Sequence, residues 1–518
     1  MWWISFVVLC LVGGVWALAS PLMSVPDEPA HAIKAAAMWR GELRGYVIDL
    51  PPGNPAGVPS QVVDKVPEEY AQLHDEPSCY KGKPSQPAGC TPVIDDDQAI
   101  VQIGSPAGTY PPLFYAAVGW TSRLLSPYRA IYGMRLCSVL MCAALLASAL
   151  ASARSLGRTR LAVGGVVLAV TPMTLFLAGS VNPNGLEIAA SIATFVVLLD
   201  LLTRRGAPPT RLLVRALVVA SCFVAARPLS PLYFVLAIGF VVVAALTRER
   251  LSELVADTRA RIAGAALAVV ALLSALLMVL APPPLAGLPR PDLTFRNAFP
   301  DSFDLLDFRA RQMIGLFGWL DTVVPDWLTH GWLWAVGCIV VVALVVDTTV
   351  RRRITLLGAV AATVLVPLTI ESVQAHEIGL YWQGRYTLPL AVGVPILAGW
   401  MIADAPLVAT AVGRRIGTAV VVVISVGVGF VQLFAWATAL SRYVVGAPTG
   451  TFSFLHGNGW RPPFGSSTLF GLALLAFVAY AGWMILLAVG GPPSADAARA
   501  SGRTHALVGA EEGGHQPD

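Results

Sequence analysis

The sequence has 518 residues, of which 56 % are hydrophobic and only 13 % carry a charged side chain. A soluble protein of this length needs more polar residues to cover its surface, so the composition excludes a soluble globular protein and indicates a polytopic membrane protein. The net charge of +4 comes largely from arginines in short loops and gives no support for nucleic-acid binding.

Apolar stretches bounded by arginine, proline or polar clusters predict about twelve membrane-spanning helices, because about 20 residues rising 1.5 Å each cross a bilayer. Several stretches are short, so the number can differ by one or two. The stretches cover residues 2–19, 131–153, 161–179, 184–203, 212–226, 230–247, 262–281, 331–348, 354–371, 385–404, 415–438 and 467–489. The predicted fold class is therefore an all-α transmembrane bundle.

The first apolar stretch ends in Ala17-Leu18-Ala19, which resembles the cleavage site of a secretory signal. It lacks a basic segment in front and its apolar core is long. We therefore expect this stretch to remain as a membrane span, with cleavage as the alternative.

Directly after this stretch, charged residues occur in Pro26-Asp27-Glu28-Pro29-Ala30-His31. If a helix begins here, Asp27 and His31 lie one turn apart on the same face. One hypothesis is that Asp27 or Glu28 acts as general base on an acceptor hydroxyl. The alternative is that Asp27 only caps the helix, which stabilises it by about 1 kcal/mol and needs no substrate.

Glu28 and His31 also have the ExxH spacing found in carboxylate-bridged di-metal proteins. Residues 1–490 contain no second ExxH motif, and the sequence has no HExxH motif. We therefore expect no protein-bound transition metal, and only a loosely held divalent cation near the carboxylates stays open as a cofactor.

Residues 20–130 form a long first loop. From Glu28 to about Leu43 the pattern predicts an amphipathic helix along the membrane surface. Residues 51–107 are polar and rich in proline and glycine, which predicts an irregular lid and not a second domain. A short interfacial helix follows, beginning at Tyr110-Pro111-Pro112-Leu113-Phe114-Tyr115.

Two cysteines, Cys79 and Cys90, lie in this first loop, whereas the other five lie within apolar stretches. If the loop faces an oxidising compartment, a pair at this spacing predicts a disulfide. The alternative is two free thiols.

Further candidate residues occur where other outer loops meet the spans. Asn182 and Asn184 lie in a tight turn, where they either contact substrate or simply close the turn. Arg227 stands at the outer end of a span and needs a partner there, which can be a lipid-linked phosphate or the headgroups to which it snorkels.

The second large outer segment, residues 282–330, predicts a surface helix over Phe308–Asp321 with Arg309 and Arg311 on its polar face. The next outer loop carries His376, which could shape a pocket. It also carries three further candidates for substrate binding, of which the arginine suits a phosphate because guanidinium groups bind phosphate in a bidentate fork. These three residues are Gln383, Arg385 and Tyr386.

Arginines occur in every second loop, and cytoplasmic loops retain an excess of such residues. We therefore expect a multi-pass protein of the plasma (inner) membrane, with both termini in the cytoplasm and Asp27 on the extracytoplasmic face. Residues 1–490 are expected to form one transmembrane module, followed by a disordered cytoplasmic tail over 491–518. The arginines concerned are Arg154, Arg158, Arg160, Arg204, Arg205, Arg211, Arg215, Arg248, Arg250, Arg259, Arg261, Arg351, Arg352, Arg353, Arg414 and Arg415.

Five motifs, in the order in which they occur, resemble a family of mostly uncharacterised bacterial integral membrane proteins grouped with the GT-C glycosyltransferase superfamily. The motifs are Pro26-Asp27-Glu28-Pro29-Ala30-His31, Tyr110-Pro111-Pro112-Leu113-Phe114-Tyr115, Asn182-Pro183-Asn184-Gly185, Gly315-Leu316-Phe317-Gly318-Trp319-Leu320-Asp321 and Gln383-Gly384-Arg385-Tyr386-Thr387-Leu388-Pro389.

The resemblance implies a membrane enzyme whose active site lies between the first outer loop and the bundle, with a polyprenyl-phosphate sugar as donor. In GT-C enzymes an acidic residue of the first outer loop serves as base. By position this role falls on Asp27, with Glu28 beside it. Dependence on a divalent metal varies across the superfamily, so the resemblance implies no fixed cofactor.

The leading hypothesis is therefore an extracytoplasmic glycosyltransferase that moves a sugar from a lipid-phosphate carrier to a cell-envelope acceptor. Asp27 would deprotonate the acceptor, Glu28 would assist, His31 would bind acceptor or phosphate, and Arg227 and Arg385 would hold the leaving phosphate. The alternative is a transporter or flippase of a lipid-linked glycan, which needs ionisable residues deep within the spans. A non-catalytic scaffold is a third hypothesis.

Overall fold

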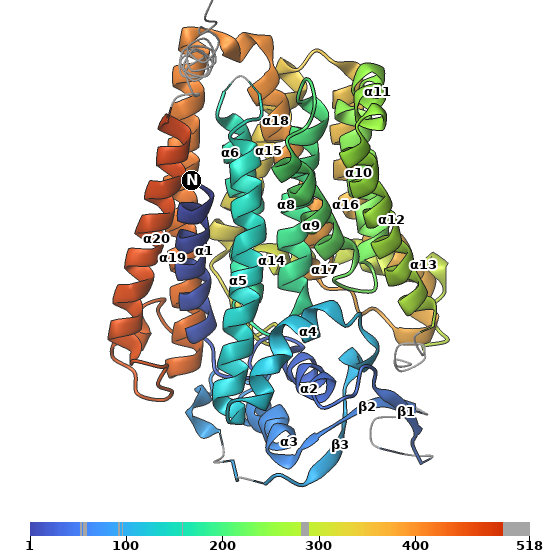
Figure 1. Cartoon of the computed structure of the whole chain (residues 1–518). Coiled ribbons are helices and arrows are strands. Elements are labelled where there is room, and N and C mark those ends of the chain that lie inside the picture. The colour runs from blue at the N-terminus through green and yellow to red at the C-terminus, as the bar shows by residue number, and fades with distance from the viewer. Residues whose placement is uncertain are drawn as a thin grey trace, which may run out of the picture.

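The computed structural model describes residues 1–51, 54, 60–91, 94–95, 97–157, 159–280 and 290–490. Long helices form a bundle, and a small layer of strands and short helices covers one end of it (Figure 1). The predicted tail over 491–518, Arg158 and the Pro282-Pro283-Pro284 start of the second outer segment lie outside the described residues.

The α-helices are α1 (Trp2–Leu18), α2 (Glu28–Met38), α3 (Glu68–Asp75), α4 (Leu113–Gly119), α5 (Pro127–Ala153), α6 (Leu161–Ala169), α7 (Pro172–Ala178), α8 (Pro183–Thr203), α9 (Thr210–Val224), α10 (Ser230–Ala245), α11 (Arg248–Ala256), α12 (Thr258–Val279), α13 (Phe295–Asp304), α14 (Leu306–Ile314), α15 (Asp326–Val346), α16 (Val350–Ile378), α17 (Gly384–Ala391), α18 (Gly393–Asp404), α19 (Ala411–Val445) and α20 (Ser466–Val489). Short 3₁₀ turns are η1 (Glu76–Cys79), η2 (Ala88–Cys90), η3 (Pro106–Thr109), η4 (Trp120–Arg123), η5 (Pro406–Ala409) and η6 (Ser453–Leu455).

Within the described residues, eight helices are long and apolar enough to cross a bilayer, or up to ten if each of two bent pairs counts as one span. The bent pairs are α6 with α7 and α10 with α11, and α1 is a shorter apolar helix. The chain is therefore a multi-pass, mostly helical membrane protein, as predicted. Helix length and hydropathy do not by themselves establish the predicted number of twelve.

Burial separates the centre of the bundle from its periphery. The apolar window of α8 is 94 % buried, whereas that of α12 is only 6 % buried. A span that is apolar all round and still exposed must face lipid, so α12 lies at the edge and α8 in the core. The N-terminal ends of α8, α10 and α17 and the C-terminal end of α9 meet near the covering layer (Figure 1).

The covering layer contains regular β-structure, which corrects the prediction of an irregular lid over 51–107. Strands β1 (Tyr46–Asp49), β2 (Ser60–Pro67) and β3 (Ile100–Gly104) form an antiparallel sheet in the order β1-β2-β3. The sheet covers α2, and buried Lys34 of α2 pairs with buried Asp64 of β2 at 3.5 Å.

Helix α2 is not the surface helix that the sequence predicts. Every residue from Glu28 to Ala37 is buried, because α2 lies between the bundle and the covering layer and contacts α3, α4 and β2. Gly119 permits this close contact, since a Cβ there would stand 2.2 Å from the carbonyl oxygen of Ala35. The burial of α2 is therefore determined by the elements packed around it and not by its own amphipathic pattern.

The second outer segment also differs from the prediction. The helix expected over Phe308–Asp321 ends at Ile314, and a hairpin of β4 (Leu316–Phe317) and β5 (Thr322–Val323) follows. Gly318 and Leu320 both take positive φ in its turn, which a helix cannot accommodate. Arg309 lies buried in an ion pair with Glu371 and not on a polar face.

Candidate functional site

Asp27 stands in a strained turn between α1 and α2. Its φ of 64° and ψ of −4° lie in the left-handed region, which non-glycine residues rarely adopt. Residues held in such a conformation occur preferentially at functional sites. The Asn182 amide nitrogen supports the turn by donating to the Pro26 carbonyl at 2.8 Å. Asp27 occupies the N-cap position of α2, but its side chain makes no capping hydrogen bond. The carboxylate is therefore directed to other groups.

The partner of Asp27 is Arg385 at the start of α17. The Arg385 Nη2 atom donates to Asp27 Oδ2 at 2.7 Å. The Arg385 side chain is 3 % exposed, whereas that of Asp27 is 41 % exposed. Burial by itself would raise the pKa of the Asp27 carboxyl, but the neighbouring cations, led by Arg385, outweigh it and hold that pKa below its usual value. The site thus presents an ionised carboxylate that a ligand can reach.

A second arginine, Arg227, lies beside the first. It stands between α9 and α10, and its Nη1 atom lies 3.3 Å from Glu187 Oε2 on the central helix α8. Ser230 Oγ accepts from the Arg227 backbone and donates to Glu187 Oε1 at 2.7 Å. Glu187 and Ser230 therefore hold Arg227 in place.

Tyr386 lies between the two guanidinium groups. Its ring centroid is 4.9 Å from Arg227 Cζ and 5.1 Å from Arg385 Cζ. The Arg385 Nη2 atom also donates to the Tyr386 hydroxyl at 3.2 Å, and Tyr110 contributes a second ring, 5.8 Å from Arg227 Cζ. Aromatic faces attract such cations and restrict their orientation.

Several donors of these arginines are unused. Among the described residues, Arg385 Nε and Nη1 and Arg227 Nε have no hydrogen-bond partner, although each is buried. A buried donor without a partner costs about 1–3 kcal/mol, so native proteins rarely keep several together without a functional reason. Planar guanidinium groups with spare donors are suited to binding an anion such as a phosphate.

His31 lies on α2, one turn after Asp27. Its Nδ1 atom is 2.8 Å from the Tyr115 hydroxyl, and the side chain is buried. Burial lowers the pKa of the imidazole to about 3, and the charges of Arg227 and Arg385 act in the same direction while Asp27 opposes them. His31 is therefore neutral near pH 7 and offers one ring nitrogen as donor and the other as acceptor.

Glu28 has a different environment from Asp27. Arg135 of α5 forms two hydrogen bonds with it, from Nε to Oε1 at 2.7 Å and from Nη2 to Oε2 at 2.6 Å. The Val181 backbone also donates to Oε1 at 3.0 Å. Arg135 further binds the carbonyls of Ala17, Ser20 and Pro21. This buried pair joins α1, α2 and α5, and the engaged oxygens leave the ExxH spacing without a free carboxylate.

The remaining predicted residues divide into two groups. Asn184 and Gln383 lie at the starts of α8 and α17, next to the residues that contact the Asp27 turn. Each has a buried polar side-chain atom without a hydrogen-bond partner among the described residues. His376 lies in the last turn of α16, is 59 % exposed and pairs with Glu377 at 3.5 Å. In the part of the chain that the structure describes, His376 forms no hydrogen bond or ion pair with Asp27.

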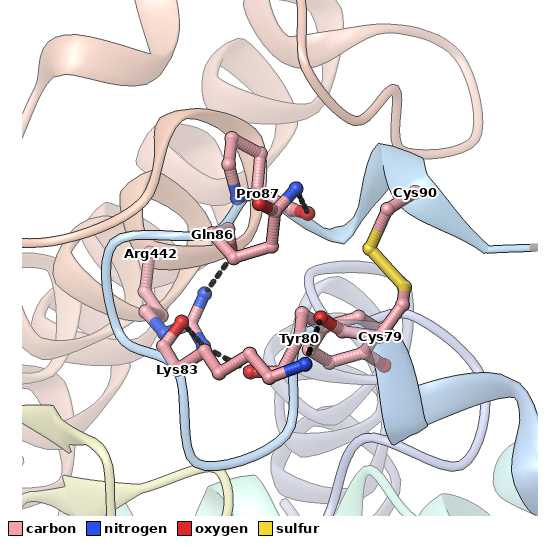
Figure 2. Close-up of a disulfide and its surroundings, with 7 residues drawn as sticks. All are labelled: Cys79, Tyr80, Lys83, Gln86, Pro87, Cys90 and Arg442. Atoms are coloured by element: carbon pink, nitrogen blue, oxygen red, sulfur yellow. Dashed lines mark hydrogen bonds between the residues drawn. A yellow bond between two sulfur atoms is a disulfide. The ribbon is translucent and has the colours of Figure 1, made fainter.

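Residues missed by the sequence reasoning include Arg135, Tyr115 and Lys81, of which Lys81 is one of the cations that lower the pKa of Asp27. Arg135 carried a usable signal, because it lies inside the predicted stretch 131–153 and an arginine within an apolar span needs a buried partner. Lys81 carried none, since it is one of two lysines in a polar loop. That loop is closed by a disulfide between Cys79 and Cys90, whose Cα atoms are 6.1 Å apart (Figure 2).

Side chains that commonly ligate metals are dispersed over the described ranges. In that part of the chain no group of three or more His, Cys, Asp or Glu side chains is placed to hold a metal ion. The chemistry that these residues offer is thus that of one carboxylate, two arginines and a neutral imidazole.

Comparisons with known proteins identify a family and a similar solved structure. The family model described as "Predicted membrane protein (DUF2142)" matches residues 10–394. No curated protein matches the sequence. Among solved structures, the crystal structure of ArnT from Cupriavidus metallidurans bound to undecaprenyl phosphate is similar at 14 % identity, covering 94 % of this chain and 75 % of that one with a TM-score of 0.40. A likeness at that TM-score supports no inference about the present site.

Proposed function

This chain belongs to the family described as Predicted membrane protein (DUF2142), whose matched region includes the whole site around Asp27, and from this premise we propose that it is a membrane glycosyltransferase. The donor is a polyprenyl-phosphate sugar, and the acceptor is a hydroxyl of a cell-envelope glycan, lipid or protein. The reaction takes place on the extracytoplasmic face of the plasma (inner) membrane.

One observation carries the proposal: the reachable Asp27 carboxylate lies 2.7 Å from an arginine that has spare donors. A base and an anion-binding group side by side are what transfer from a phosphate leaving group requires. The ordered motif resemblance to GT-C enzymes supports the same role for Asp27.

In the reaction, the acceptor oxygen attacks the anomeric carbon and forms the new glycosidic bond. The bond between that carbon and the phosphate oxygen breaks, and polyprenyl phosphate leaves with the electron pair. Asp27 takes the proton of the acceptor hydroxyl, while Arg385 and Arg227 bind the phosphate oxygens. Direct displacement inverts the configuration at the anomeric carbon.

Binding of the donor also makes the Asp27 carboxylate more basic. A phosphate that takes hydrogen bonds from Arg385 competes with the Asp27–Arg385 ion pair and neutralises the nearby positive charge. Because that charge holds the pKa of Asp27 down, donor binding raises the pKa and makes the carboxylate a stronger base. Glu28 keeps its pairing with Arg135 and has a structural role.

The proposed orientation follows from the arginine pattern. Helix α11, which carries Arg248 and Arg250, lies at the end of the bundle opposite α2 and the strands (Figure 1). Arginine-rich loops stay in the cytoplasm, so the site layer faces outward and both termini face inward.

The test is sugar transfer in membrane vesicles supplied with radiolabelled polyprenyl-phosphate sugars. Native protein is compared with Asp27→Asn and with the control Asp301→Asn, which removes an exposed carboxylate of α13. We expect transfer to fall by at least about 10²-fold for Asp27→Asn only. Equal transfer by folded Asp27→Asn protein would contradict the proposal. Movement of the labelled lipid across the membrane without transfer would favour the flippase alternative.

A further inference from the structure

The connection between α16 and α17 ends at the arginine that pairs with Asp27. Its last residues, Trp382–Arg385, are here called the arginine turn. Helix α17 begins at Gly384, so the backbone amides of Trp382 and Gly384 lie before its first intrahelical hydrogen bonds. Buried amides need partners, and here both partners are side chains from other elements.

The first partner is Glu371 of α16, whose side chain is fully buried. Its Oε1 atom accepts from the Trp382 amide at 2.7 Å. Its Oε2 atom accepts hydrogen bonds from Arg309 and from the Ser302 hydroxyl, and Arg309 also donates to Ser302 at 2.8 Å. One oxygen of the carboxylate thus binds the arginine turn, and the other binds α13 and α14.

The second partner is Gln312 of α14, which is also buried. Its Oε1 atom accepts from the Gly384 amide at 2.5 Å. The backbone of α14 lies directly against the same residue, because a Cβ at Gly384 would stand 2.0 Å from the Arg309 carbonyl oxygen. Helix α14 therefore holds the chain at the position just before Arg385.

The other side of the arginine turn faces the candidate site. Arg385 donates to Asp27 at 2.7 Å and to the Tyr386 hydroxyl at 3.2 Å. The Trp382 indole donates to Thr387 at 2.9 Å, and its ring lies edge-on to that of Tyr386 with centroids 6.0 Å apart. The turn is thus fixed between α14 and α16 on one side and the residues around Asp27 on the other.

Phosphate binding by Arg385 depends on the orientation of its guanidinium group. Two of its donors, Nε and Nη1, have no hydrogen-bond partner among the described residues. A guanidinium binds a phosphate through paired donors in one plane, so rotation of the group loses a hydrogen bond. A tilt of the arginine turn would therefore weaken phosphate binding although Arg385 itself is unchanged.

We propose that Gln312 and Glu371 are positioning residues for Arg385, and that helix α14 sets the guanidinium for the donor phosphate through them. The inference rests on the proposed function and extends it to a segment for which the sequence predicts only a surface helix. It also gives the buried Glu371–Arg309 pair a role, since a buried ion pair is often no more stabilising than well-packed apolar residues.

The first experiment measures the donor KM for native protein, Gln312→Met and the control Gln432→Met. Gln432 of α19 is likewise buried and donates to the Val170 carbonyl at 2.8 Å, in the bend between α6 and α7. We expect KM to rise about tenfold for Gln312→Met only, as for loss of one hydrogen bond to a charged ligand. A merely structural role would reduce the amount of active protein and leave KM native, and that result overturns the inference.

Rescue by a conservative change belongs to the same experiment. Gln312→Glu retains an acceptor oxygen at the same reach and should keep the donor KM within about twofold of native. A KM as high as that of Gln312→Met would overturn the role of the Gln312–Gly384 hydrogen bond.

The second experiment asks whether Gln312 acts through Arg385. Binding of polyprenyl phosphate alone to purified protein in nanodiscs is measured for native protein, Gln312→Met, Arg385→Met and the double variant. Both single variants should bind more weakly, and the double variant should bind about as Arg385→Met does. Additive losses, or weaker binding by Arg385→Met only, overturn the inference and leave the proposed function standing. Native binding by Arg385→Met overturns both proposals.

The third experiment moves the arginine turn without removing a hydrogen-bonding group. Gly384→Ala places a methyl group against the Arg309 carbonyl, so the turn must shift away from α14. This variant should show the same rise in donor KM as Gln312→Met, and it tests the inference even if Gln312→Met protein does not fold. The control is Gly482→Ala, because nothing lies within 4 Å of a Cβ there. A native KM for Gly384→Ala overturns the role of α14.

The fourth experiment isolates the hydrogen bond between Glu371 and Trp382. Arg309→Met/Glu371→Leu removes the ion pair and the acceptor for the Trp382 amide, and it should raise the donor KM as Gln312→Met does. Arg309→Met/Glu371→Gln also removes the ion pair but retains an oxygen for that amide, so it should restore most of the donor affinity. Equal KM values for the two double variants overturn the role of Glu371.

Discussion

At the scale of single residues, Asp27 combines a strained backbone with a depressed pKa. Left-handed φ costs roughly 1–2 kcal/mol for most residues, although aspartate tolerates it better than branched side chains do. The Asn182 bond to Pro26 and the Arg385 pair retain this conformation. The strain places the carboxylate toward Arg385 and away from the helix end that it would otherwise cap.

The first prediction concerns the pH dependence of transfer. The pKa of Asp27 is depressed in the free protein, so the base is ionised above that pKa and activity is lost as pH falls through it. Donor phosphate removes part of the depressing charge. We therefore expect the acid limb of kcat to lie at higher pH than the acid limb of kcat/KM, measured by transfer rates between pH 3 and 8. Coincident limbs, or a kcat limb at lower pH, would contradict this account.

The residue scale also shows the limit of reasoning from sequence. The prominence of Asp27, Arg227 and Arg385 could be seen from their positions next to apolar stretches. Their assembly could not, because Asp27 and Arg385 are separated by 358 residues and no periodicity connects them. The different roles of Asp27 and Glu28 likewise depend on Arg135, which only the fold brings to Glu28.

At the scale of elements, the Glu28–Arg135 pair holds the α1–α2 turn against α5. Removal of one member leaves a buried charge without its partner, which destabilises proteins by about 3–5 kcal/mol. We predict that Arg135→Met lowers the thermal unfolding midpoint of the detergent-solubilised protein by several degrees or prevents its accumulation. The control Arg129→Met removes an exposed arginine of the same helix. Similar midpoints for the two variants would show that the pair is dispensable.

Glu76 in η1 is another buried carboxyl, three residues before Cys79. Burial raises its pKa to about 7. Because its pKa is higher in the folded than in the unfolded state, stability falls as pH rises from about 4.5 to 7. Glu76→Gln should remove this loss and stabilise the protein by about 2–3 kcal/mol at pH 8, with little effect at pH 4. Unfolding midpoints at both pH values check the prediction, and a stabilisation as large at pH 4 would refute it.

Sequence patterns predicted the helical elements better than the covering layer. Each predicted apolar stretch overlaps a helix or a bent pair, because lipid leaves a spanning backbone few alternatives. Strand β2 was missed because residues 62–64 are buried in succession, so apolar and polar residues do not alternate along it. Helix α2 was misplaced because its burial is imposed by the sheet and by α4, not by its own pattern.

At the scale of the whole molecule, the residues around Asp27 lie at one end of the bundle and arginine-rich turns lie at the other (Figure 1). This orientation predicts which residues a membrane-impermeant maleimide can reach. In a Cys338→Ser background, Asp301→Cys should label in sealed right-side-out vesicles, whereas Arg415→Cys should label only after permeabilisation. Both positions are exposed. The reverse pattern would place the site in the cytoplasm.

Arg442 of α19 donates hydrogen bonds to three backbone carbonyls of the loop that the Cys79–Cys90 disulfide closes, and this has a consequence for biosynthesis. Gln86 and Arg442 are separated by 356 residues, and ribosomes add about 5–20 residues each second. In the proposed orientation the loop is exported roughly 20 to 70 seconds before α19 emerges, and cysteine oxidation has that interval to close the ring. The Arg442 guanidinium, which is synthesised later, then meets three carbonyls that the closed ring has already arranged, so the order of translation favours this pairing.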